Sequence, residues 1–139
     1  MKRLGPVSML CGSVVAVLVL GAAQRPAALA MTSGGLWEVS GAPGTRAPVR
    51  MCVADPAMLA QYEHRGQPCT RLVISDTPEA TVIHYTCPAR GFGHSKLTLV
   101  TPRSLRVETQ GISDNLPFNY VLQARRVGEC GPGQSASRH

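Results

Sequence analysis

Aromatic residues are scarce in this chain of 139 residues, which contains one Trp, two Phe and three Tyr. Proteins that bind single-stranded nucleic acid usually stack bases on aromatic side chains, so no such platform is expected here. The formal net charge of +6 does not change this conclusion. The basic residues beyond the N-terminal segment are scattered, with Arg125 and Arg126 as their one adjacent pair, whereas phosphate-tracking surfaces are clustered. We therefore expect no nucleic-acid partner.

Recognisable catalytic, cofactor and metal motifs are also missing. The chain has no Gly-x-Ser-x-Gly segment, which a serine hydrolase of the α/β type would carry. It has no Cys-x-x-Cys pair either, a spacing typical of redox centres and structural zinc. Gly91-Phe92-Gly93 precedes an expected strand rather than a helix, so we interpret it as a turn and not a phosphate loop. We predict that the protein is not an enzyme and has no catalytic, cofactor-binding or metal-binding residues.

The first 30 residues resemble a secretory signal peptide. Lys2 and Arg3 precede an apolar stretch over 7–20, and small residues follow it. We favour cleavage after Ala30, while cleavage after Ala23 is the alternative. The apolar stretch is shorter than the roughly 20 residues that span a bilayer, so no stable membrane span is expected after cleavage. These features predict a periplasmic or secreted protein.

Four cysteines remain when Cys11 is removed with the expected leader. An even number of cysteines in a small exported domain predicts disulfides, here two of them. Four cysteines allow three pairings, and the sequence does not choose between them. We favour the pairing of sequence neighbours, Cys52 with Cys69 and Cys87 with Cys130.

The mature chain has short runs of β-forming residues separated by Gly, Pro, Asp and Asn, a rhythm typical of antiparallel β domains. We predict a mainly β fold, an antiparallel curved sheet or partial barrel of about seven strands with one short helix. One domain is expected over 31–130, followed by a flexible tail over 131–139, in a monomeric protein. The expected strands cover 36–40, 48–53, 70–75, 81–87, 96–101, 105–110 and 118–127.

Two local patterns refine this prediction. Asp55 and Pro56 suit the N-cap and first position of a helix over 57–64. A three-residue hairpin loop over 102–104 is expected, because it places four aliphatic side chains on one face of the hairpin. These are Leu97, Leu99, Leu105 and Val107.

Several short motifs resemble the bacterial domain-of-unknown-function family 3617, and the resemblance covers about residues 34 to 130. It implies export, four spaced cysteines and a β-rich fold, but no reaction or cofactor that can be transferred. The chain lacks a long Met-rich insertion that many relatives carry before the first cysteine. The motifs are Gly35-Leu36-Trp37-Glu38-Val39, Met51-Cys52-Val53, Cys69-Thr70, Cys87-Pro88-Ala89-Arg90-Gly91 and Ala124-Arg125-Arg126-Val127-Gly128-Glu129-Cys130.

These features predict a non-catalytic binding module of the cell envelope. The curved sheet would enclose a small apolar ligand, or it would offer a strand edge to an envelope protein. Three side chains are candidates for ligand or partner contact. Trp37 lies either in the core or at the mouth of a cavity, and Phe92 is expected to be exposed. Arg90, on a disulfide-held loop, suggests an alternative in which the protein resembles a protease inhibitor.

Overall fold

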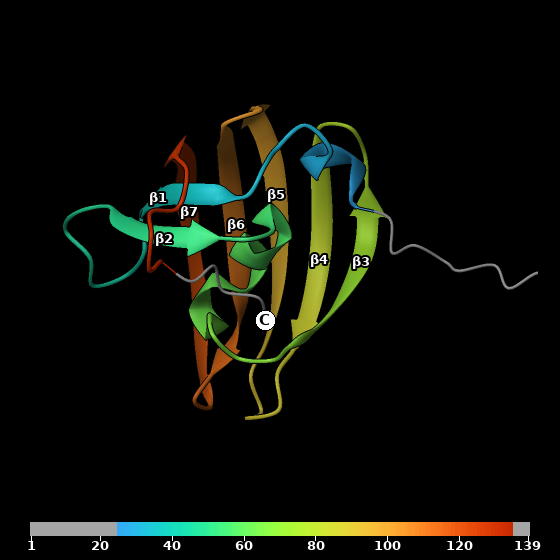
Figure 1. Ribbon diagram of the computed structural model, residues 1–139. Helices are drawn as coiled ribbons and strands as arrows, with labels where there is room; N and C mark the ends of the chain where they lie inside the picture. Colours follow the sequence, from blue (N-terminus) through green and yellow to red (C-terminus); the bar gives the residue numbers. More distant parts are fainter. Residues whose placement is uncertain (1–24, 135–139) are drawn as a thin grey trace, which may run out of the picture.

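Seven antiparallel strands form a single curled sheet that does not close into a barrel (Figure 1). The computed structural model describes residues 25–134. The strand order is β2-β1-β7-β6-β5-β4-β3, so that β2 and β3 are the two edges. This confirms the predicted mainly β fold. The strands are β1 (Gly35–Ser40), β2 (Val49–Val53), β3 (Thr70–Asp76), β4 (Ala80–Thr86), β5 (Phe92–Thr101), β6 (Ser104–Ser113) and β7 (Leu116–Gly128).

The predicted helix is present as η2 (Pro56–His64), which packs on β4, β5 and β6 (Figure 1). The Asp55 carboxylate accepts a hydrogen bond from the backbone N–H of Ala57 at 3.0 Å, as an N-cap does. The helix is of the 3-10 type and has a kink at Gln61. A second 3-10 turn, η1 (Ala27–Leu29), packs on β4 and β5.

The core lies between the sheet and these two short helices. Alternate residues along each central strand point toward it, as the pleat of a strand requires. Trp37 is completely buried, and its indole N–H donates to the carbonyl of Ser33. The other large side chains that are fully buried include Leu29, Leu59, Ile83, Tyr85, Leu97, Leu105 and Leu122.

The β5–β6 hairpin confirms the predicted face but not the predicted loop. Leu97 lies opposite Val107 and Leu99 opposite Leu105, so the four aliphatic side chains share one face. The loop itself has two residues rather than three, because Thr101 pairs with Ser104. An irregularity between Leu99 and Thr101 shifts the register by one residue and restores the one-sided pattern.

The predicted turn at Gly91-Phe92-Gly93 is wrong, because β5 begins at Phe92. Gly91 and Gly93 are instead required by close packing. A Cβ atom on Gly91 would collide with the His64 ring, and one on Gly93 would collide with the Tyr85 ring. The turn lies just before them, and it is closed by a hydrogen bond from the Cys87 N–H to the Gly91 carbonyl at 2.8 Å.

The two predicted disulfides are present, but the favoured pairing is wrong. Cys52 is bonded to Cys130 and Cys69 to Cys87. The strand order explains both bonds. Leu36 of β1 pairs with Cys52 on one side and with Gly128 of β7 on the other, which brings Cys130 close to Cys52. Cys69 and Cys87 flank the open end of the β3–β4 hairpin, so they lie side by side. Cys52 precedes η2 and is therefore not adjacent to Cys69 along the chain.

The segment just after residue 24 is part of the core. Leu29 has no exposed surface and belongs to the main hydrophobic cluster. The backbone N–H of Ala27 donates to both carboxylate oxygens of Asp76, at 2.9 and 2.8 Å. Most of the predicted signal peptide lies outside the described residues. At the other end, Gly131 and Gln134 form a hydrogen-bonded turn, and the rest of the predicted tail also lies outside them.

Candidate functional site

The edge strand β3 is the most exposed element of the sheet. All seven of its residues are exposed, and β4 is its one strand partner within residues 25–134. Three consecutive aliphatic side chains are exposed to solvent, with fractions of 62% for Leu72, 45% for Val73 and 54% for Ile74. The strand thus combines a free backbone edge with apolar side chains.

Three contacts hold β3 in place despite its exposure. At its start, the Cys69–Cys87 disulfide joins it to the end of β4. In its first half, the Arg71 guanidinium donates to the side-chain oxygen of Gln61 in η2 at 2.8 Å. At its end, the Asp76 carboxylate accepts the N–H of Ala27. The edge is therefore anchored at both ends and on its inner side.

The β3–β4 register assigns the side chains of the edge to two faces. Leu72 lies opposite His84 on the outer face, because the neighbouring Ile83 and Tyr85 are buried on the inner face. An irregularity between Val73 and Ser75 leaves Ile74 without a direct partner on β4. Bulges of this kind are one way in which natural proteins blunt an edge.

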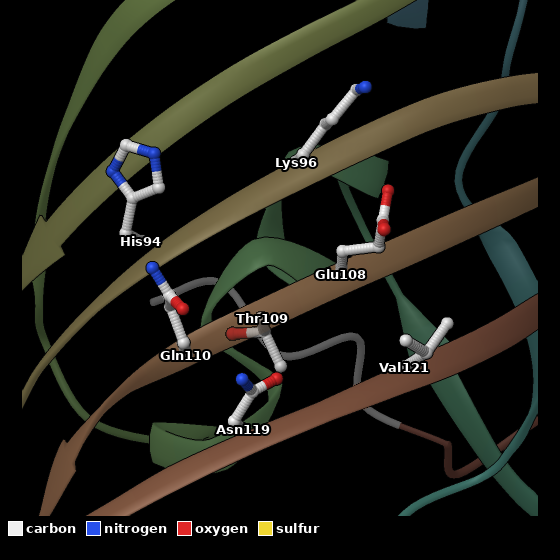
Figure 2. A pocket seen from close by; sticks show the side chains of 7 residues that line it. All are labelled: His94, Lys96, Glu108, Thr109, Gln110, Asn119 and Val121. Carbon is white, nitrogen blue, oxygen red and sulfur yellow. The ribbon is translucent and has the colours of Figure 1, made fainter.

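The outer face of the sheet continues from β3 across the molecule in polar rows. Figure 2 shows one row formed by His94, Gln110 and Asn119, which come from β5, β6 and β7. The next row contains Lys96 and Glu108, and Thr109 points away toward the core. The hollow between these rows is open, and its walls are polar apart from Val121. It does not resemble a pocket for an apolar ligand.

A second hollow lies on the inner side, between η2 and β7. It is an open cleft of about 460 Å³ whose walls include Tyr62, Phe118 and Tyr120. The Tyr120 hydroxyl donates to the Glu63 carboxylate at 2.7 Å, and the Arg65 guanidinium lies 4.7 Å from the centre of the Tyr62 ring. Burial, together with the bond to Glu63, raises the pKa of Tyr120. Because these polar groups already bind one another, they leave few specific contacts for a ligand.

A buried polar centre lies beneath η2. His64 Nδ1 is 3.1 Å from the Tyr85 hydroxyl oxygen, and burial raises the pKa of Tyr85. Ser95 donates to the carbonyl of Ala60 at 2.5 Å and also contacts the Thr109 hydroxyl at 2.7 Å. No motif in the sequence singles out His64. Its place at the end of a predicted helix was the one local hint that it faces the sheet.

The structure separates the three predicted contact residues. Trp37 is in the core and has no exposed surface. Phe92 is 42% exposed at the start of β5, on the outer face, with its ring centre 6.1 Å from that of His84. Arg90 is exposed on the turn between β4 and β5, where its φ is 61°. This left-handed conformation differs from the extended backbone of a substrate-like inhibitory loop, so the geometry does not favour the protease-inhibitor alternative.

Within the described residues, no group of three or more His, Cys, Asp or Glu side chains is placed to hold a metal ion. None of the helices in this part of the chain is long and apolar enough to cross a membrane. No known protein family, curated protein or solved structure matches the chain. The resemblance to family 3617 therefore stays a prediction.

Proposed function

We propose that the protein is an exported, non-catalytic binding module that takes up an extended segment of an envelope polypeptide as an additional strand on β3. The exposed apolar edge is the single observation that carries this proposal. In strand addition, backbone hydrogen bonds supply affinity and alternate side chains supply specificity. The two disulfides support a location in an oxidising compartment, the periplasm or the exterior.

The contrast between the two sheet edges supports β3 as the binding edge. The other edge strand, β2, has five residues, and the Cys52–Cys130 disulfide ties it to the segment after β7. Strand β3 has seven residues and carries the three exposed aliphatic side chains. Long apolar edges favour association with other chains, so proteins usually shorten or cover them. Apart from the bulge at Ile74, this edge is open and anchored at both ends, which suits a partner.

The side chains around β3 define the chemistry of that partner. Leu72, His84 and Phe92 form a mixed aliphatic and aromatic surface on the outer face. Arg71 and Asp76, the charged residues of the strand, already have partners in η2 and η1. The segment that fits is uncharged and extended, with aliphatic or aromatic residues at alternate positions.

The experiment uses peptides selected against the protein from a displayed library of random sequences. We expect the selected peptides to alternate apolar residues and to shift the backbone amide NMR signals of β3. The variant Leu72→Lys/Ile74→Lys should bind them at least about tenfold more weakly, since a charge at each position disrupts the apolar contact. Val100→Lys is the matched control, because Val100 is 59% exposed and lies on β5, which β4 separates from β3.

Two outcomes would contradict the proposal. Peptides whose signal shifts map to the cleft between η2 and β7 would assign binding to Tyr62 and Tyr120 instead. A dimer in sedimentation experiments that dissociates in the Leu72→Lys/Ile74→Lys variant would show that a second copy of the chain occupies β3.

We also propose that export removes the leader after Ala23 rather than after Ala30. Cleavage after Ala30 would remove Leu29 from the core and the Ala27 N–H from Asp76. Cleavage after Ala23 leaves both in the mature chain, with Gln24 as its first residue. The mass of the protein purified from the periplasm distinguishes the two sites.

A further inference from the structure

Two histidines face each other on the outer side of the sheet. His84 of β4 and His94 of β5 occupy directly opposite positions in the register, and their ring centres are 6.4 Å apart. Both side chains point away from the core, because Ile83, Tyr85 and Ser95 alternate with them on the buried face. Within residues 25–134, neither imidazole takes part in a hydrogen bond or an ion pair. Their nitrogens are therefore available to a ligand from solvent.

We propose that His84 and His94 together bind one divalent transition-metal ion, and Cu²⁺ most tightly, through one ring nitrogen each. Neutral imidazole is the commonest protein ligand for such ions, and Cu²⁺ heads the affinity order of the first-row divalent metals. The four disulfide-bonded cysteines are not available as competing thiolates. This inference rests on the β4–β5 register and not on the proposed β3 partner, although His84 also borders the surface around Leu72.

The geometry allows one ion to reach both rings. Directly opposite residues in an antiparallel pair have Cβ atoms about 4.5–5.5 Å apart. Two metal–nitrogen bonds of about 2.0 Å require ligand nitrogens roughly 3 Å apart, which both rings reach by turning about their side-chain bonds. His94 is exposed and His84 is half-buried, so this rotation displaces no core side chain. A bound ion would then link β4 to β5.

The surroundings predict an ion with open coordination positions. Gln110 lies opposite His94 in the same row (Figure 2), so its side-chain amide is the next polar group across the sheet. Glu108 belongs to the next row and is paired with Arg106 at 2.6 Å. Lys96 also belongs to that row, and its ammonium group is a hydrogen-bond donor without a lone pair for a metal. Water therefore completes the coordination, and the ion is exchangeable.

The test is a titration of the untagged, oxidised full-length mature protein with CuCl₂, followed by calorimetry and electron paramagnetic resonance. We expect one ion per chain, with nitrogen hyperfine splitting from two imidazoles. His84→Gln and His94→Gln should each weaken Cu²⁺ binding at least about tenfold, because one of the two protein ligands is lost. Lys96→Gln, from the same outer face, should leave the affinity unchanged or slightly raised.

A measurement on the wild-type protein tests the proposal even where the variants fold poorly. Paramagnetic Cu²⁺ should broaden the ring NMR signals of His84 and His94 at substoichiometric metal, while the buried His64 keeps its signal. An unaltered Cu²⁺ affinity in the His84→Gln/His94→Gln double variant would overturn the proposal. Broadening centred on His139 or on the mature N-terminus would overturn it as well.

Discussion

The Nδ1 atom of His64 lies 3.1 Å from the hydroxyl oxygen of Tyr85, in the layer between η2 and the sheet. The same imidazole packs edge-on against the rings of Tyr85 and Phe118, with ring centres 5.5 and 5.9 Å away. Its Nε2 atom is buried without a hydrogen-bond partner and faces Gly91. The loop before β5, η2 and the sheet are thus packed together at a single side chain.

Gly91→Ala is expected to destabilise the protein by about 1–3 kcal/mol, because the added methyl group collides with His64 in a well-packed site. In a His64→Ala background the same change should cost much less, since the colliding ring is absent. Urea denaturation of the four proteins of this cycle measures the coupling between the two positions.

Gly128→Ala is the matched control for that cycle, because a Cβ atom there would meet nothing within 4 Å. Its effect should stay within about 0.5 kcal/mol, as for most surface changes. Equal costs of Gly91→Ala with and without His64 would show that the two side chains do not collide in solution.

Stability is expected to fall at high pH because of Tyr85 and Tyr120. Burial raises the pKa of each above the ordinary value of 10.0, and the negative charge of Glu63 adds to the shift. The unfolded chain therefore loses these protons first, so the stabilisation is complete below pH 10 and decreases as the pH rises above it. Urea denaturation above pH 10 should show a shallower decline for Tyr120→Phe than for the wild type. Tyrosinate absorbance that develops fully before unfolding would contradict this.

Tryptic digestion without reductant should identify the disulfides directly, because cleavage after Arg50, Arg65, Arg71, Arg90 and Arg126 separates all four cysteines. The peptide over 51–65 should be linked to one that begins at Val127, and 66–71 should be linked to 72–90. A link between 51–65 and 66–71 would instead indicate the pairing of sequence neighbours.

Loss of the two disulfides should have unequal costs. The Cys52–Cys130 bond closes a loop with a sequence separation of 78 and Cys69–Cys87 one of 18. Loop-closure entropy then predicts costs of about 4.5 and about 3 kcal/mol for the two Cys→Ser double variants. Calorimetric unfolding in the oxidised state measures both. A larger cost for the shorter loop would show that native-state contacts outweigh chain entropy.

Leu29→Ala should destabilise the protein by about 2–5 kcal/mol, because it leaves a cavity in the core. Met31→Ala is the control two residues away, where the side chain is 68% exposed. Denaturation midpoints of the two variants separate the outcomes. A mature chain that begins at Met31 and folds with full stability would show that Leu29 is dispensable.

Local patterns in the sequence were enough to predict the fold class. Alternation of apolar and polar residues assigned the buried face of the β5–β6 hairpin, since successive side chains on a strand point to opposite faces. Asp55 and Pro56 marked the start of η2 because capping involves only adjacent residues. Four cysteines after a predicted leader led to the prediction of two disulfides for a similarly direct chemical reason.

The candidate sites and the disulfide pairing depended on the tertiary structure. Only the strand order places Cys52 beside Cys130 and leaves β3 as an open edge. Only the β4–β5 register brings His84 opposite His94. These relationships join residues that are distant along the chain, and a shift of one position in strand pairing would reverse the faces and change every neighbour. The sequence by itself determined which residues are apolar, which can cap a helix and which can form disulfides. The long-range pairing of strands decided which of these residues come into contact.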